Sequence, residues 1–270
     1  MNTDGSTVLW HLKVSNFNEK ARWALDYKGV PHLRRAIDAG FHRRTARRLT
    51  GGRTFPILVV DGQAIGDSTA IVAELERRYP NPPLYPSGRE ERGRALTLED
   101  FFDEELGPYA RLLVLDHLME ERDLFGHTFA PDMRPARRYL MRRIYPLTKR
   151  AVTRQFGIDD ISLQHAYQKV YAAGRRFREE LQPSDYLVGD DFSVADLTLA
   201  ALVSPVVCPE QFPYSQPQRD HPLLDPIRDA LAESGVLDWT RAMYALHRAP
   251  TAEVPAGRSP SAAPAAAAGV

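Results

Sequence analysis

The sequence predicts an α/β domain built on a mixed four-stranded sheet, followed by an all-helical domain. Strand and helix patterns alternate up to about residue 80, and strand patterns largely vanish after the proline-dense segment Tyr79 to Pro86. The chain has 270 residues, of which 43% are hydrophobic, so it is long enough to bury two modest cores. Strands that are joined by helices imply a mixed sheet with helices packed on its faces.

The first domain is expected to follow the order β-α-β-α-β-β-α. Gly29 and Pro31 end the first helix, and Asp61-Gly62 is typical of a hairpin turn between two strands. The expected elements are a strand at Thr7–Leu12, a helix at Asn16–Lys28, a strand at His32–Ile37, a helix at Phe41–Leu49, a strand at Ile57–Val60, a returning strand at Ala64–Ile65 and a helix from Thr69 onward.

The second domain carries only helical patterns. Ser193 and Asp196 form an S-x-x-D capping box before an apolar run, and we interpret this pair as structural. The expected helices span Glu90–Glu121, Pro135–Phe156, Leu163–Leu181, Val194–Val207 and Pro222–His247. The predicted organisation is therefore a first domain at 1–80, a linker at 81–89, a helical domain at 90–249 and a disordered tail at 250–270, which is rich in Ala, Pro and Ser.

Composition excludes several classes of function. The 35 basic and 35 acidic residues balance, so nothing in the overall charge favours nucleic acid or a membrane as partner. Cys208 is the only cysteine, which excludes a disulfide within the chain, a CxxC pair and a cysteine-rich zinc site. The histidines lack metal-ligand spacing, and no P-loop or GxGxxG occurs. With no signal peptide and no long apolar run, we expect a cytoplasmic protein without a metal.

The segment from Thr54 to Ser68 carries the clearest sign of a site. Pro56 stands at the start of a strand, where its missing N–H costs no ladder hydrogen bond. Asp67 and Ser68 then open a helix, whose free backbone donors favour an anion. The plainer alternative is that Asp67 or Ser68 is an ordinary helix cap.

In three passages the chain resembles the cytosolic glutathione transferase superfamily. The passages are Ser15–Leu25 at the first helix, Thr54–Ser68, and Tyr186–Asp196 in the second domain. The resemblance covers most of the chain. It implies a thioredoxin-like N-terminal domain with a cis bond before Pro56, a helical C-terminal bundle, glutathione as co-substrate and a homodimer.

In this resemblance Ser15 matches the residue that contacts the glutathione sulfur in serine-type and cysteine-type transferases. A serine with no cysteine nearby excludes glutaredoxin-type dithiol chemistry and leaves activation of a bound thiol. Ser15 also stands at the N-cap of the first helix, so a purely structural role is the alternative. Asn16 and Asn18 replace the proline and the second cysteine of many relatives, and either could assist with side-chain donors.

The same resemblance implies which residues hold the peptide. Ser68 and the helix amides would bind the γ-glutamyl carboxylate, Asp67 would approach the ammonium group, and Phe55 would pair with the cysteinyl part through its backbone beside Pro56. Further candidate contacts are Asn18, Thr54 and Arg53.

The function implied is activation of the glutathione thiol for attack on a small hydrophobic electrophile. The electrophile pocket would lie between the domains. Tyr109 is a candidate lining residue, but aromatic residues at helical spacing more often belong to the core. One alternative is a non-catalytic module that binds a protein partner through the arginine-rich segment Arg134–Arg154. Another is an isomerase or dehalogenase that uses the thiol without consuming it.

Overall fold

The computed structural model describes residues 7–38, 42–129 and 135–255, with the side chains of 135–138 and 141 left out. The N-terminal domain contains β1 (Val8–His11), α1 (Asn16–Tyr27), β2 (Leu33–Ala36), α2 (His42–Thr50), β3 (Ile57–Val60), β4 (Gln63–Gly66) and α3 (Ser68–Arg78). The sheet order is β2-β1-β3-β4, with β1 parallel to β2 and antiparallel to β3. This confirms the predicted mixed four-stranded sheet.

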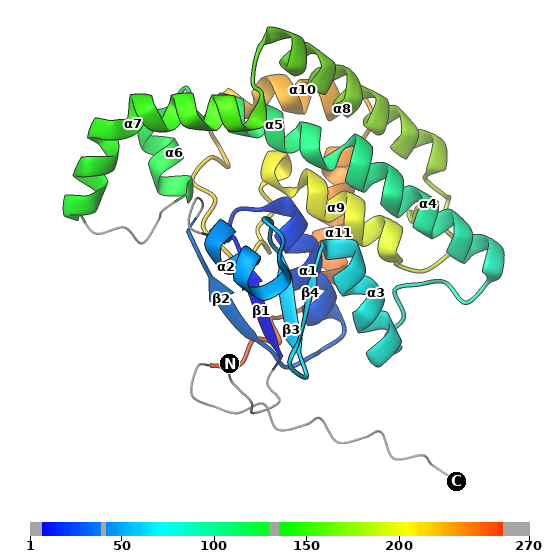
Figure 1. Cartoon of the computed structure of the whole chain (residues 1–270). Coiled ribbons are helices and arrows are strands. Elements are labelled where there is room, and N and C mark those ends of the chain that lie inside the picture. The colour runs from blue at the N-terminus through cyan, green and yellow to red at the C-terminus, as the bar shows by residue number, and fades with distance from the viewer. Residues whose placement is uncertain (1–6, 39–41, 130–134, 256–270) are drawn as a thin grey trace.

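The sheet lies between two layers of helices, which Figure 1 shows at the lower centre of the molecule. Alternate residues of β3 point to opposite faces, so Leu58 and Val60 pack in the main core while Ile57 packs with Phe55 and Ala46 on the α2 side. The helices α1 and α3 contact each other on the main-core side. The alternating side chains of β3 thus contribute to the packing on both faces of the sheet.

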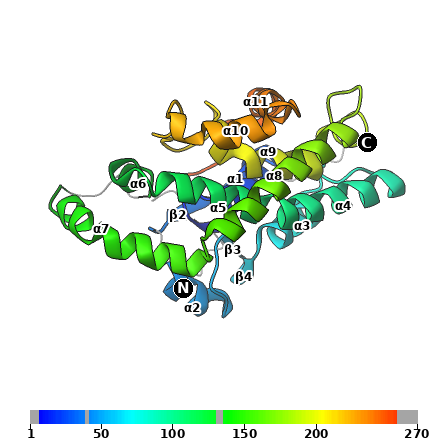
Figure 2. The same cartoon turned by 90° about the horizontal axis from the view of Figure 1, so that it is seen from above.

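The C-terminal domain contains helices and one short 3-10 turn among its described residues (Figures 1 and 2). Its elements are α4 (Arg89–Glu105), α5 (Gly107–Leu118), α6 (Arg122–Phe129), α7 (Pro135–Phe156), α8 (Asp160–Glu180), α9 (Val194–Val207), η1 (Pro222–Leu224), α10 (Asp225–Ala232) and α11 (Val236–His247). Figure 2 shows α6 and α7 together at one edge, away from α9 and α11.

Two predicted helices are each divided in the structure. The predicted helix Glu90–Glu121 ends at Glu105, and α5 starts at Gly107 with Pro108 in its first turn, so the single-helix prediction is wrong. A proline cannot donate within a helix but is favoured in its first turn. The predicted helix Pro222–His247 is likewise divided, at Gly235, whose φ is +79°. The sequence patterns also did not predict α6.

The central helix α9 packs against α1, α4, α5 and α11 and is buried on nearly all sides. Its capping box forms as predicted: Asp196 Oδ2 accepts from the Ser193 backbone N–H at 2.9 Å and from its hydroxyl at 2.8 Å, while Oδ1 accepts from the Leu187 N–H at 2.8 Å. Burial raises the pKa of Asp196 to about 6. The pair therefore anchors the start of the most buried helix, as the structural interpretation predicts.

The start of the predicted tail belongs to the folded structure, so the prediction of disorder from residue 250 is wrong for residues 250–255. Glu253 forms a parallel bridge with His32, and the Val254 N–H donates to the His32 carbonyl at 2.9 Å. The Ala252 N–H donates to Asp26 Oδ1 at 2.9 Å. Residues 256–270 of that prediction, like Phe41 of the predicted second helix, lie outside the described residues. Buried acceptors on Asp26 of α1 and on His32, just before β2, explain why a short segment is held there.

No helix within the described ranges is both long and apolar enough to cross a membrane.

Candidate active site

The candidate site forms where α1, β3 and α3 begin. Ser15 is the N-cap of α1, with φ −82° and ψ 130°, and it is half-buried. Its Oγ accepts from the Asn18 backbone N–H at 3.4 Å and from Asn18 Nδ2 at 2.7 Å. The structure therefore confirms the helix-cap role of Ser15 and leaves the residue partly exposed.

The buried Asn18 side chain links Ser15 to the Phe55-Pro56 segment. Its Nδ2 also donates to the Phe55 carbonyl at 3.2 Å, and its Oδ1 accepts from the Leu12 N–H at 2.9 Å. Asn18 is fully buried. It therefore lies behind Ser15 rather than on the surface of the site, which differs from its predicted place as a ligand contact.

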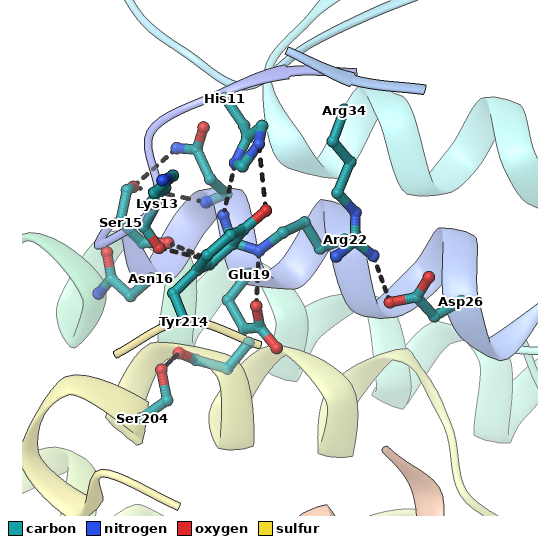
Figure 3. A network of polar contacts seen from close by, with 12 residues as sticks. His11, Lys13, Ser15, Asn16, Glu19, Arg22, Asp26, Arg34, Ser204 and Tyr214 are labelled. Carbon is teal, nitrogen blue, oxygen red and sulfur yellow. Dashed lines mark hydrogen bonds and ion pairs between the residues drawn. The ribbon is translucent and has the colours of Figure 1, made fainter. Parts of the chain in front are cut away.

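Asn16 points away from the site (Figure 3). Its Nδ2 donates to the carbonyls of Gly107 and Leu202, both at 3.3 Å, and the residue is buried. These two carbonyls belong to α5 and α9, so Asn16 joins the start of α1 to the helical domain. The two asparagines that flank Phe17 thus make different contacts, and of the two only the Asn18 side chain bonds to the Ser15 hydroxyl.

The loop before α1 is held by Arg22, whose side chain extends toward Ser15 in Figure 3. Its guanidinium donates to the carbonyls of Leu12 at 3.0 Å, Lys13 at 3.2 Å and Ser15 at 3.4 Å. Glu19 neutralises it through a buried ion pair of 2.7 Å. Nothing local in the sequence reveals this role, because an arginine two turns into a helix carries no sign that it folds back on the preceding loop.

His11 completes the network around Arg22. Arg22 donates to His11 Nδ1 at 3.0 Å, so that nitrogen is the acceptor and Nε2 carries the proton toward the Tyr214 hydroxyl at 3.3 Å. The His11 and Tyr214 rings are stacked with centroids 5.5 Å apart. Burial and the neighbouring Arg22 lower the pKa of His11 to about 2. His11 is therefore a neutral structural group and not an acid or base for catalysis.

The Phe55-Pro56 bond is cis, as the family resemblance implies. Phe55 buries its ring beside His42 of α2, with centroids 5.7 Å apart, and its carbonyl is bonded to Asn18. No described residue accepts a hydrogen bond from the Phe55 N–H. That N–H remains available to a ligand, whereas Thr54 and Arg53 are exposed in the preceding loop.

The start of α3 offers free donors beside Asp67. Asp67 has φ +74°, a left-handed conformation that an aspartate rarely adopts and that often marks a binding site. Its Oδ1 caps the helix by accepting from the Ala70 N–H at 3.1 Å. Among the described residues none bonds to the Ser68 hydroxyl or to the backbone N–H groups of Ser68 and Thr69. These donors lie at the positive end of the helix dipole, which suits a carboxylate.

Tyr109, the candidate pocket residue, lies on α5. Its ring packs edge-on against the ring of His165, with centroids 5.2 Å apart. Arg111, one turn after Gly107, has its guanidinium over the rings of Phe17 and Phe156 at 5.6 and 5.5 Å. Over the described part of the chain, no group of three His, Cys, Asp or Glu residues could hold a metal ion.

Comparison with known proteins gives the family. The model of the glutathione S-transferase N-terminal domain matches residues 9–83, and the model of the C-terminal domain matches residues 140–233. The chain belongs to the glutathione S-transferase family. Glutathione is the co-substrate of this family.

The relatives of this glutathione S-transferase include isomerases. It is 32% identical over 118 residues to a maleylacetoacetate isomerase of Dictyostelium discoideum, covering 42% of this chain and 54% of that one. It is 24% identical over 198 residues to a probable maleylacetoacetate isomerase of Caenorhabditis elegans, covering 73% and 77%. The matched region thus spans about half of the first relative and more of the second.

Solved structures agree on the fold. A maleyl pyruvate isomerase, described as a bacterial glutathione S-transferase of the Zeta class, superposes with a TM-score of 0.53 and 22% identity over 91% of this chain and 97% of that one. The similarity confirms the thioredoxin-like domain and the helical bundle that the sequence predicts.

Proposed function

We propose that this glutathione S-transferase activates the thiol of glutathione through the Ser15 hydroxyl. The observation that carries the proposal is the position of Ser15 at the start of α1, joined through one side chain to Phe55 at the cis-Pro56 step. An anionic sulfur beside Ser15 would meet both a hydroxyl donor and the positive end of a helix dipole.

The energetics of this arrangement are sufficient without a separate base. A free thiol has a pKa near 8.5, and lowering it by about two units requires about 2.7 kcal/mol. A hydrogen bond to a charged sulfur supplies about 1.5–3 kcal/mol, and a helix N-terminus adds about 0.3–1 kcal/mol. We propose that Phe55, Asp67 and Ser68 hold the peptide, with Thr54 near its glycyl end.

The test combines binding and turnover. Calorimetry should detect glutathione binding to the wild-type protein, and Ser15→Ala should lower kcat/KM for conjugation to an activated aryl halide by about 10- to 150-fold. Ser162→Ala, which removes a hydroxyl from the capping box of α8, is the matched control and should leave kcat/KM unchanged. Absence of glutathione binding would contradict the proposal, and so would full activity of Ser15→Ala.

Isomerisation is the second candidate, favoured by the names of the relatives and by Arg111. The maleyl compounds in those names are carboxylates, and among the described residues no acid pairs with Arg111, whose guanidinium lies between two aromatic rings. In this reaction the thiolate adds to a cis double bond, the resulting single bond rotates, and expulsion of the thiolate regenerates glutathione.

Product analysis separates the two reactions. Isomerisation of a maleyl carboxylate would convert cis to trans without consuming thiol, and Arg111→Gln should lower kcat/KM for this substrate but not for a neutral aryl halide. Arg175→Gln, on an exposed part of α8, is the control. The binding-module alternative predicts no thiol-dependent turnover with either substrate, so the same assays test it.

We further propose that the protein acts in the cytoplasm as a homodimer. Both statements are supported by the family to which the chain belongs. Light scattering of the purified chain measures the oligomeric state directly, and a monomer at working concentration would contradict the dimer.

A further inference from the structure

One buried amide, that of Asn18, contacts both halves of the candidate site. Its Nδ2 lies 2.7 Å from Ser15 Oγ and 3.2 Å from the Phe55 carbonyl oxygen. Its Oδ1 lies 2.9 Å from the Leu12 backbone nitrogen. The side chain thus donates two hydrogen bonds and accepts one, and it joins the loop before α1 to the Phe55 segment.

The Leu12 contact fixes which way the amide points. A backbone N–H can only donate, so the atom that faces Leu12 must be the oxygen and the two N–H groups must face Ser15 and Phe55. A rotated amide would place a carbonyl oxygen against the Phe55 carbonyl and an N–H against the Leu12 N–H. Both contacts would be repulsive in a fully buried position.

This orientation decides what the Ser15 hydroxyl can do. Its oxygen accepts from Asn18 Nδ2 and, more weakly, from the Asn18 backbone N–H at 3.4 Å. A hydroxyl has two acceptor sites and one proton, so the accepted bonds leave the proton unused. Within the described ranges no residue accepts from the Ser15 hydroxyl, and the residue is only half-buried. The proton is therefore available to a group on the open side.

We propose that Asn18 is a positioning residue that turns the Ser15 O–H proton toward the sulfur of bound glutathione. Its second N–H, on the Phe55 carbonyl, ties the segment that holds the peptide to the hydroxyl that stabilises the thiolate. This inference rests on the proposed function and adds to it a residue that touches no reacting atom. The hydrogen bonds from Asn18 therefore fix the orientation of the Ser15 hydroxyl so that its proton is donated toward the sulfur.

The variant Asn18→Asp tests the proposal because it keeps the shape and the Leu12 contact but removes both donors. The carboxylate would instead accept the Ser15 proton and turn the hydroxyl away from sulfur. The readout is the pKa of glutathione bound to the enzyme, followed by the ultraviolet absorbance of the thiolate. We expect this pKa to rise by about one to two units, as in Ser15→Ala, which corresponds to a lost hydrogen bond to a charged sulfur.

The direct effect of the new negative charge is measured in a protein that lacks the hydroxyl. The double variant Ser15→Ala with Asn18→Asp carries the same carboxylate. The difference in thiol pKa between this double variant and the single variant Ser15→Ala therefore gives the electrostatic effect of the charge alone. Asn18→Asp lowers the acid dissociation constant of the bound thiol by some factor in each background. We expect this factor to be at least ten times larger when Ser15 is present than in the Ser15→Ala protein. Equal shifts in the two backgrounds would overturn the proposal.

Asn18→Ala provides a second cycle that introduces no charge. It should raise the thiol pKa when Ser15 is present and leave it unchanged in the Ser15→Ala protein, while the Kd for glutathione changes less than kcat. Failure of the proposed function has a different signature, namely no glutathione binding or a thiol pKa in Ser15→Ala that equals the wild-type value. Normal binding and a raised pKa in Ser15→Ala, with a wild-type pKa in both Asn18 variants, would overturn the positioning role alone.

Discussion

Lys20 of α1 and Glu99 of α4 form an ion pair of 2.8 Å in which both side chains are fully buried. The pair crosses from the N-terminal domain to the helical domain. Lys20 Nζ also lies 2.5 Å from Asp103 and 2.8 Å from the Thr69 hydroxyl, which is in the first turn of α3. One lysine therefore ties α1, α3 and α4 together close to the start of α3, where the peptide is proposed to bind.

Lys20→Met should destabilise the protein by about 3–5 kcal/mol, because it leaves Glu99 buried without its counter-charge. Burial already raises the pKa of Glu99, with Lys20 acting in the opposite direction. The double variant Lys20→Met with Glu99→Met removes both charges and should recover most of the loss. Urea denaturation measures the free energies of unfolding. If the double variant is as unstable as the single one, the lost charge pairing is not the cause.

Gly107→Ala should destabilise the protein by about 1–3 kcal/mol through overpacking. A Cβ at this position would lie 2.5 Å from Phe17 Cζ and 3.0 Å from Leu202 Cδ2. Gly93→Ala, within α4, is the control: its Cβ would meet nothing within 4 Å, so it should stabilise the helix by about 0.5–1 kcal/mol. Shortening the obstructing ring with Phe17→Leu should restore part of the stability of Gly107→Ala. Thermal unfolding compares the four proteins.

His32 should make the protein less stable in mild acid. Its Nδ1–H donates to the Val30 carbonyl at 2.8 Å and its Nε2 accepts from Arg34 at 3.0 Å, which fits the neutral ring. Burial lowers its pKa to about 4. Because the folded pKa lies below the unfolded value of about 6.5, the stabilisation is complete above pH 6.5 and is lost as the pH falls toward 4.

Between pH 7 and pH 5 this one residue should cost about 2 kcal/mol in the free energy of unfolding. His32→Gln removes the titration, so the stability difference between wild type and variant should shrink by that amount over the interval. His127→Gln, at an exposed position of α6, should leave the pH dependence as in the wild type. A constant difference between wild type and His32→Gln across the interval would show that His32 titrates normally.

Ser68→Ala should raise the Kd for glutathione by about 10- to 150-fold, the value of one hydrogen bond to a charged carboxylate. Ser68 is 3% exposed at the first position of α3, and no described residue forms a hydrogen bond with its hydroxyl. Calorimetry measures the Kd, and Thr97→Ala, whose hydroxyl donates within α4 to the Gly93 carbonyl, is the control. An unchanged Kd would show that the Ser68 hydroxyl does not bind the carboxylate, so that only the backbone N–H groups at the start of α3 would do so.

Local sequence signals located most of the elements of the fold. The strand at Ile57–Val60 follows Pro56 and ends at Asp61-Gly62, and it appears in the structure with those bounds. The helix from Asn16 begins after a serine that the structure confirms as its cap. These features depend on neighbours a few residues away, so periodicity and capping chemistry reveal them.

One failed prediction had a local signal that was outweighed, and another depended on contacts distant in sequence. The order Leu106-Gly107-Pro108 could have signalled the break between α4 and α5, yet its apolar continuity favoured one helix. Thr251 to Val254 resemble a linker in composition, but they are held by Asp26 and His32. No local pattern reveals acceptors more than 200 residues earlier in the chain.

The sequence by itself determined the two-domain order, the capped start of α1 and the presence of Ser15, Pro56, Asp67 and Ser68 in a spacing typical of the family. Only the tertiary structure decided what Asn16 and Asn18 do. They are two residues apart on one helix, and their side chains therefore point in different directions, one toward α5 and α9 and the other toward Ser15 and Phe55. Which of the two side-chain amides supports the site depends on the groups that each one contacts. Packing between segments far apart in the chain decides those contacts.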